Sequence, residues 1–265
     1  MRVFTIASGS SGNCVYVGSA DTHLLVDAGV SCKRIIQGIE DAGVTAGEID
    51  AVLVTHEHID HVRSLGVLAR RKGIPVYVNE RTFRALKRDS RLGEIPEELV
   101  HIFNTGCDFR IGDIDVHSFS TSHDAADPVG YRFRNGARTF AVATDLGTYD
   151  GRISRELEGL DGVLLESNHD VRMLEAGPYP YPLKRRILSD SGHLSNEMAG
   201  RLLSSIVHDN LKFIMLGHLS QMNNYPELAL ETVSAELTFG ENPYRASDFN
   251  INTAAPDAPG QIFEW

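Results

Sequence analysis

The sequence predicts an α/β sandwich, in which β-sheets are covered by helices. Short apolar runs bounded by Gly, Ser and Asp fill the N-terminal third, and the same pattern returns between residues 100 and 144. Segments with the apolar spacing of helices follow each of these strand-rich stretches. Hydrophobic residues make up 42% of the 265 residues and charged residues 23%, which is typical of a packed globular chain and argues against disorder.

The individual elements follow from the same patterns. Residues 100 to 144 are expected to form strands, with a hairpin at Asn135-Gly136, a dipeptide that favours tight turns. The tail from about residue 240 is expected to be loop-rich. No internal repeat or long linker is evident, so we expect one domain over residues 1–265. The other predicted strands are 2–7, 13–18, 23–28, 51–55, 75–78, 161–165 and 212–216, and the predicted helices are 31–42, 60–72, 80–89, 194–207 and 225–237.

Cysteine content, hydropathy and charge argue against several classes of protein. Three scattered cysteines (Cys14, Cys32 and Cys107) are too few for a disulfide framework or a thiolate metal site. No apolar run approaches the ~20 residues that cross a membrane, and the N-terminus lacks the apolar core of a signal peptide. We therefore expect a cytoplasmic protein without a membrane partner. The net charge of −11 argues only weakly against a nucleic-acid partner, because the charge is unevenly distributed.

A cluster of histidines follows the strand predicted at 51–55. Residues 55–61 read THEHIDH, and imidazole and carboxylate groups are common ligands of zinc and similar ions. His56 and His58 can turn to one side of an extended chain, and Asp60 and His61 follow in the first helical turn. This spacing suits two adjacent metal ions better than one. A polar loop with Asp60 as a helix N-terminal charge is the weaker alternative.

Four further residues stand at predicted strand ends: Asp27, His123, Asp145 and His218. Each is weak evidence alone, since a strand-end Asp usually forms a turn and a strand-end His usually lies on the surface or in the core. In this order, and with H-x-H-x-D-H at 56–61, they resemble the five motifs of the metallo-β-lactamase fold superfamily. The resemblance implies an αββα sandwich of two mixed β-sheets flanked by helices.

The resemblance also implies roles for these residues. His56, His58 and His123 would hold one divalent ion, and Asp60, His61 and His218 would hold a second. Asp145 would bridge the two ions, and Asp27 would support the ligands by hydrogen bonding. Two ions can activate a water for in-line attack on phosphorus, with Asp60 accepting its proton. Zinc or manganese is expected and iron is possible, because this ligand set suits all three.

Other features narrow the class within the superfamily. The di-iron oxidases resemble H-x-E-x-D, with a carboxylate where this chain has His58, which argues against an oxidase. Secreted lactamases carry signal peptides, and the N-terminus of this chain does not resemble one. The stretch between Asp145 and His218 is too short for the inserted domain of the β-CASP nucleases. Segments 9–13, 164–196 and 217–227 closely resemble the YycJ/WalJ group of small bacterial metallo-β-lactamase proteins, over nearly the whole chain. That resemblance implies 5′-exonuclease action on DNA.

Candidate substrate-binding groups surround these motifs. The cations Lys184, Arg185 and Arg186 lie beside Ser-Asp-Ser-Gly-His, where they could bind phosphate or simply form a solvated helix end. His193 precedes a predicted helix N-terminus, a position that favours an anion, and is the candidate catalytic residue beside Asp60. His169 could support a ligand or be structural. The loop residues Ser10, Ser11 and Asn13 could close over the metals or form a plain turn.

A basic segment completes the prediction. Residues 63–91 hold nine Lys and Arg residues against Glu80 and Asp89 alone. This segment could bind along a phosphate backbone or form solvent-exposed basic faces of two helices.

The leading hypothesis is a two-metal phosphodiesterase that acts on nucleic acid, DNA rather than RNA. The alternative is a small-molecule metallo-hydrolase, such as a thioesterase or cyclic-nucleotide phosphodiesterase. An inactive binding module is disfavoured because all seven ligands are present. The oligomeric state stays open.

Overall fold

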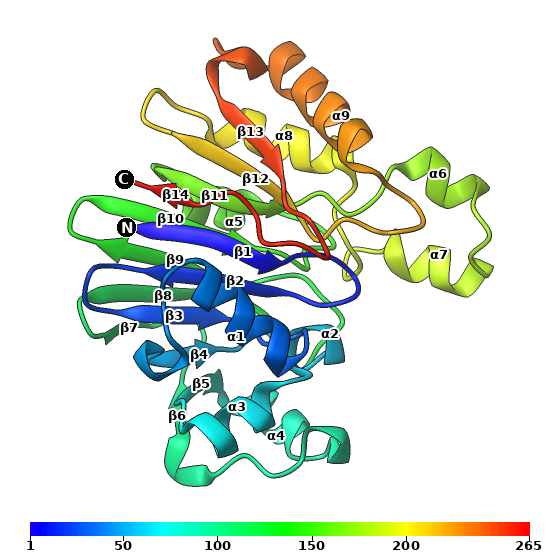
Figure 1. The fold of residues 1–265 in the computed structure, drawn as a ribbon. Coiled ribbons are helices and arrows are strands. Elements are labelled where there is room, and N and C mark those ends of the chain that lie inside the picture. The colour runs from blue at the N-terminus through cyan, green and yellow to red at the C-terminus, as the bar shows by residue number, and fades with distance from the viewer.

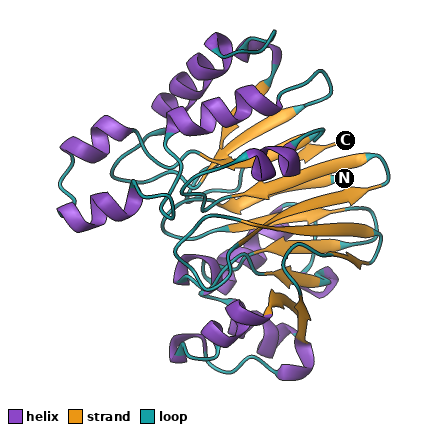
Figure 2. Ribbon diagram, turned by 180° about the vertical axis from the view of Figure 1, so that it is seen from behind, coloured by secondary structure: helices purple, strands orange, loops and turns teal.

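The computed structural model describes residues 1–265 and confirms the predicted αββα sandwich, with two seven-stranded sheets packed face to face (Figures 1 and 2). The first sheet has the order β14-β1-β2-β3-β4-β5-β6, and its strands are β1 (Arg2–Ala7), β2 (Cys14–Gly18), β3 (His23–Val26), β4 (Ala51–Leu53), β5 (Val76–Asn79), β6 (Val100–Phe103) and β14 (Phe263–Glu264). The second has the order β13-β12-β11-β10-β9-β8-β7, and its strands are β7 (Asp108–Ile111), β8 (Ile114–Ser120), β9 (Val129–Asn135), β10 (Arg138–Ala143), β11 (Gly162–Glu166), β12 (Phe213–Gly217) and β13 (Asn250–Thr253).

Helices cover the outer face of each sheet. The first sheet is flanked by α1 (Cys32–Asp41), α2 (Ile59–Val62), α3 (Leu65–Lys72) and α4 (Glu80–Leu86), and the second by α5 (Gly151–Leu157), α8 (Asn196–Ile206) and α9 (Pro226–Phe239). Two short helices, α6 (Val171–Ala176) and α7 (Tyr181–Ile187), project beyond one edge of the sandwich (Figure 1). The remaining turns of 3₁₀ helix are η1 (Ala46–Glu48), η2 (Ser90–Leu92), η3 (Glu97–Leu99) and η4 (Ala246–Asp248). No helix is both long and apolar enough to span a membrane.

Three apolar layers hold the sandwich together. They arise because successive side chains of a strand point to opposite faces of the sheet. On β12, Phe213 and Met215 belong to the core between the sheets, whereas Ile214 and Leu216 belong to the core beneath α5, α8 and α9. The third layer joins the first sheet to α1 and α3. Burial on both faces explains why the central strands are continuous apolar runs in the sequence.

The strand directions bring separate loops to one edge of the sandwich. β3 to β6 are parallel neighbours, as are β10 to β13. β8 also runs in the direction of β10, because both are antiparallel to β9. The carboxyl ends of strands that run the same way lie at the same edge of a sheet, and this edge is where α/β proteins place their binding sites. The α6–α7 projection lies beside the same edge (Figure 1).

The structure corrects three local predictions. Residues 60–72 form two helices, because Ser64 is tied to the preceding loop: its N–H donates to the Ala28 carbonyl at 2.8 Å and its hydroxyl to the Val30 carbonyl at 2.5 Å. The tail is not only loop, since β13 and β14 each complete a sheet. The helices α5, α6 and α7 were not predicted, because each has only six or seven residues and a weak apolar pattern.

Candidate metal centre

The predicted ligands meet at the carboxyl edge of the two sheets. His56 and His58 follow β4, and α2 then carries Asp60 and His61. The partners from the second sheet follow three further strands: His123 comes after β8, Asp145 after β10 and His218 after β12. The two halves of the chain therefore contribute to one polar cluster, which we call the metal cluster.

The metal cluster contains four overlapping groups of possible ligands, and two of them are the predicted sets of three. The other two groups are His56, His61 and Asp145, and Asp145, Glu166, His193 and His218. Within each set, one ligand atom per residue lies within 4.8 Å of the others; the sets are His56, His58 and His123, and Asp60, His61 and His218. Asp145 lies between them, because its Oδ2 is 3.2 Å from Nε2 of His61 and its Oδ1 is 3.5 Å from Nε2 of His123. This is the grouping that the sequence motifs predict.

Three atoms of the metal cluster are buried without a hydrogen-bond partner: Nε2 of His56, Nε2 of His218 and Oδ2 of Asp145. An unpaired buried polar atom is costly, so such atoms usually have a ligand. Burial lowers the pKa of His61, but Asp145, Asp27 and Asp60 outweigh burial and raise this pKa to about 9. Carboxylates that favour a proton so strongly would equally favour a metal cation. The residues present therefore fit divalent metal ions.

Hydrogen bonds at Nδ1 orient the histidines of the metal cluster. His61 Nδ1 donates to Oδ2 of Asp27 at 2.7 Å, and Thr55 anchors Asp27 through its N–H and its hydroxyl, both at 2.8 Å. His123 Nδ1 donates to the Gly192 carbonyl at 2.9 Å. Each bond fixes the ring with Nε2 on the side of the cluster, as metal-binding imidazoles require. Asp27 thus lies where a supporting residue is expected.

Three residues of this edge have left-handed backbone: Asp27 has a φ of 63°, Asp145 of 58° and His218 of 55°. Residues other than glycine rarely adopt this conformation, and Asp and His are among the types that tolerate it best. Each of the three comes directly after a strand, or one residue beyond it, where the chain turns. The left-handed turn directs these side chains into the cluster, and backbone strain of this kind is typical of functional sites.

One residue of the cluster was not predicted. Glu166, the last residue of β11, is fully buried. Its Oε1 accepts hydrogen bonds from Nδ1 of His193 at 2.8 Å and from Nδ1 of His218 at 2.9 Å. Its Oε2 accepts from the N–H groups of Leu146 at 2.7 Å and Leu194 at 3.2 Å. Burial raises the pKa of Glu166, but His193 and His218 outweigh it and hold the pKa below its usual range, so this carboxylate is ionised.

Glu166→Gln is expected to lower metal affinity or turnover by roughly 10- to 100-fold, because the amide keeps the size but cannot accept from both imidazoles as an anion does. The measurements are metal content by elemental analysis and the rate of hydrolysis. Glu175→Gln, which changes an exposed glutamate on α6, is the matched control. Unchanged metal content and rate in Glu166→Gln would show that the carboxylate only fills space.

The predicted substrate-binding residues are distributed unevenly around the cluster. Asn13 is buried, and its Nδ2 lies 3.1 Å from Nε2 of His61, whereas Ser10 and Ser11 are exposed on the turn. Arg186 forms an ion pair with Asp124, the neighbour of His123. Lys184 donates to the Glu175 carbonyl at 2.6 Å, and the side chain of the exposed Arg185 forms no hydrogen bond or ion pair.

His193 and His169 differ in their surroundings. The ring of His193 lies 5.0 Å from that of His123 and 5.2 Å from that of His218, and its Nε2 makes no hydrogen bond. His169 is buried, and neither of its ring nitrogens has a partner. Burial lowers the pKa of His169 to about 4, so the ring is neutral. It makes no hydrogen bond to any predicted ligand.

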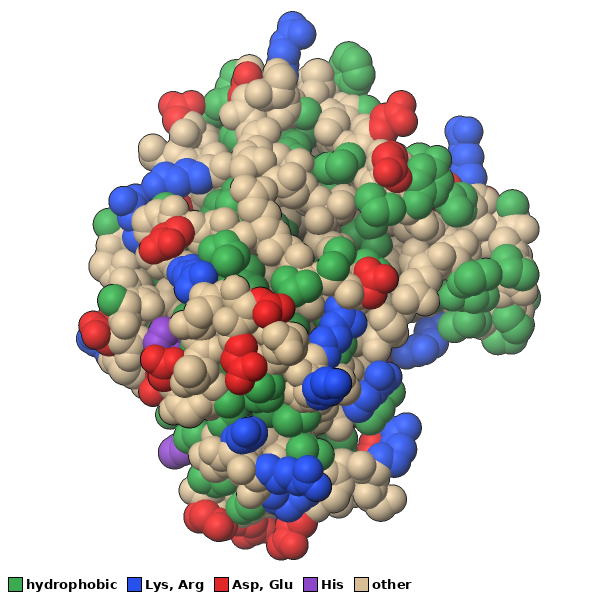
Figure 3. Space-filling view, in the orientation of Figure 1, with side chains coloured by type: hydrophobic (Ala, Val, Ile, Leu, Met, Phe, Trp, Pro, Cys, Tyr) green, Lys and Arg blue, Asp and Glu red, His purple; other side chains and the backbone are tan.

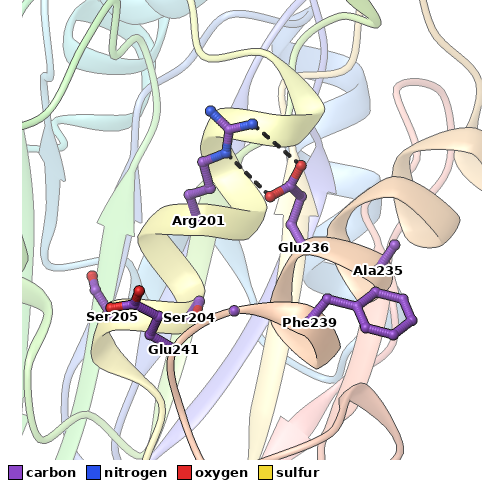
Figure 4. A pocket seen from close by; sticks show the side chains of 8 residues that line it. Arg201, Ser204, Ser205, Ala235, Glu236, Phe239 and Glu241 are labelled. Carbon is purple, nitrogen blue, oxygen red and sulfur yellow. Dashed lines mark hydrogen bonds and ion pairs between the residues drawn. The ribbon is translucent and has the colours of Figure 1, made fainter.

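A separate hollow lies in the outer helical layer, between α8 and α9 (Figure 4). Three charged residues line it, and two of them pair, because Arg201 Nε donates to Oε2 of Glu236 at 3.1 Å; the third is Glu241. No predicted site residue lines this hollow. This hollow is therefore separate from the metal cluster.

Comparisons with known proteins agree with the fold. A model of the beta-lactamase superfamily domain matches residues 22–214. The chain is 43% identical over 258 residues to exodeoxyribonuclease YycJ of Bacillus anthracis, covering 97% of this chain and 96% of that protein. It is 41% identical over 259 residues to exodeoxyribonuclease WalJ of Streptococcus pneumoniae, covering 98% and 96%.

Solved structures share the fold at low identity. The metallo-β-lactamase fold protein YhfI of Bacillus subtilis superposes with a TM-score of 0.71 at 18% identity, covering 100% of this chain and 99% of that chain. The fold and the ligand cluster thus define a metallo-β-lactamase-type protein. The chain belongs to the beta-lactamase superfamily and, within it, to the family of the YycJ and WalJ proteins.

Proposed function

We propose that this protein is a metal-dependent exonuclease that degrades DNA from the 5′ end with two divalent ions, zinc or manganese. The observation that carries the proposal is the pair of three-residue ligand sets with Asp145 between them. Two adjacent ions suit phosphodiester hydrolysis, because they can stabilise both the attacking and the leaving oxygen. The names of the two exodeoxyribonuclease relatives, which align over nearly the whole chain, support DNA as the substrate.

The side chains of the cluster would have separate roles in the hydrolysis. Bound ions would supply Lewis acidity, lowering the pKa of water and neutralising negative charge on phosphate. Burial raises the pKa of Asp60, but His61 and His218 outweigh it and hold the pKa below its usual range, so Asp60 is ionised. Its carboxylate is only partly covered, and it can accept the proton of an attacking water. His193, fixed through Nδ1 by Glu166, presents Nε2 to the phosphate or to the leaving oxygen.

The proposal predicts the products of end-labelled DNA. With manganese or zinc present, a 5′ label should appear at once in short products, while a 3′ label should remain on fragments that shorten progressively. Chelation of the metal should abolish both. The assay compares single- and double-stranded DNA with RNA of the same sequence. Early release of the 3′ label would contradict the polarity, and hydrolysis of a thioester without any cleavage of DNA or RNA would favour a small-molecule hydrolase.

A further inference from the structure

A groove borders the metal cluster, between the end of α4 with the residues that follow it and α7. It has a volume of ≈ 690 Å³, and His58 and Asp60 of the cluster form part of its lining. Its other walls include Arg88, Ser90 and Arg91. Arg186 of α7 also lines it, so two segments that are far apart in the chain face one groove. Figure 3 shows Lys and Arg side chains gathered at the lower right of the molecule, in the notch between the α6–α7 projection and the α3–α4 end.

The cations of this groove differ in how far they are neutralised. Arg91 Nε donates to Oδ1 of Asp89 at 2.8 Å. Arg186 pairs with Asp124, but that pair is exposed, with 52% and 32% of the two side chains accessible. Exposed ion pairs contribute little stability, so Arg186 can exchange its partner for a phosphate at small cost. Arg88 is exposed and its side chain has no hydrogen bond or ion pair.

Three acidic residues also line the groove, and none of them forms an ion pair with Arg88. Asp60 belongs to the metal cluster and Asp89 is held by Arg91. Glu57 accepts a hydrogen bond from the Ala126 N–H at 2.8 Å. Glu57 keeps its negative charge, so the three cations and three carboxylates of the lining balance in number. The groove still offers one cation without an ion pair, Arg88, and one exchangeable cation, Arg186, next to candidate ligands of a phosphodiesterase centre. A small substrate bound at the metals would not reach along such a wall, whereas a polymer with a charge on every nucleotide would.

We propose that this groove holds the sugar–phosphate backbone of the DNA strand next to the scissile phosphate, and that Arg88 is a phosphate-contacting residue that favours a polymeric substrate. The inference rests on the proposed nuclease function and deepens it. Arg88, just beyond the end of α4, and Arg186 of α7 would contact the strand from two separate segments. The role of Arg88 is binding and orientation of the strand and not chemistry at phosphorus.

The test is the affinity for a fluorescein-labelled, 5′-phosphorylated single-stranded oligodeoxynucleotide, measured by fluorescence anisotropy at several salt concentrations. The metal-loaded His193→Ala variant serves as the background, so that the probe is degraded slowly enough for binding to be read first. Adding Arg88→Ala should raise Kd by about tenfold at low salt, the scale of one hydrogen bond to a charged group. The slope of log Kd against log salt should fall by about 0.7, the share of one phosphate contact on a single strand. Arg88→Lys should retain the slope.

Arg71→Ala is the matched control, because Arg71 is an exposed cation of the same basic segment, unpaired and outside the groove. It should change Kd by less than about twofold, since distant surface charges are screened. Equal Kd and slope in Arg88→Ala and the background would overturn the proposal, as would equal effects of Arg71→Ala and Arg88→Ala. Binding that depends on Arg88, in a parent protein that fails to cut DNA, would contradict the proposed nuclease function and support the groove.

Discussion

Alanine in place of His193 is expected to leave the metal content unchanged and to slow DNA hydrolysis by roughly 100-fold or more, the scale for losing a proton-transfer or charge-stabilising group. The reason is geometric. Nδ1 of His193 is held by Glu166 at 2.8 Å, while its Nε2 forms no hydrogen bond and its side chain is 18% exposed. The ring borders the predicted ligands without belonging to either set of three.

The measurement combines metal stoichiometry with the rate on labelled DNA for each purified variant. His101→Ala is the matched control, because His101 is an exposed histidine on β6, at the far edge of the first sheet. Loss of one metal in His193→Ala would mean that His193 is a ligand, which its place near Asp145 and Glu166 makes a real alternative. Full metal content with full rate would show that His193 is structural.

His218→Ala is expected to lower metal content and activity together. His218 is buried, its Nε2 has no hydrogen-bond partner, and that atom lies 3.6 Å from Oδ2 of Asp60. We expect wild-type protein to contain about two metal equivalents and this variant to contain fewer. Activity should fall by more than about 100-fold, beyond the range for residues that only support a ligand.

The response to added metal further distinguishes the His218→Ala variant from the His193→Ala variant. Mass action should restore part of the activity of His218→Ala at high manganese or zinc, because the lost ligand weakens binding. The same addition should not help His193→Ala, whose metals are already bound. Two full metal equivalents in His218→Ala would contradict the predicted ligand set. The comparison is informative because Glu166 holds Nδ1 of both rings, so only the environment of Nε2 distinguishes them.

The ligand cluster could be predicted from the sequence because its motifs follow recognisable strands, directly or within a few residues. The carboxyl ends of parallel strands lie at one edge of a sheet, so motifs that follow such strands are expected to lie close together. Glu166 was missed because a single glutamate after VLL is indistinguishable from the start of a turn. The available signal was its position: β11 lies between the strands that precede Asp145 and His218, so its last residue must lie between them.

Other features depend on contacts that no local pattern contains. Counting charges in residues 63–91 could not show which cations are engaged. Within that segment Arg84 pairs with Glu80 and Lys87 pairs with Glu97, whereas Arg88 stays free. The edge strands β13 and β14 have four and two residues, and they form only because a completed sheet offers them a partner.

The left-handed turns at Asp27, Asp145 and His218 limit how heat-resistant this protein can become while it remains active. Each such residue costs roughly 1–2 kcal/mol relative to an ordinary backbone conformation, and glycine would relieve most of that cost. Directed evolution that rewarded folding alone at high temperature would therefore drive these positions toward glycine. Its most stable products would keep the sandwich and lose the cluster, so a screen for thermostable variants must select for turnover in the same step.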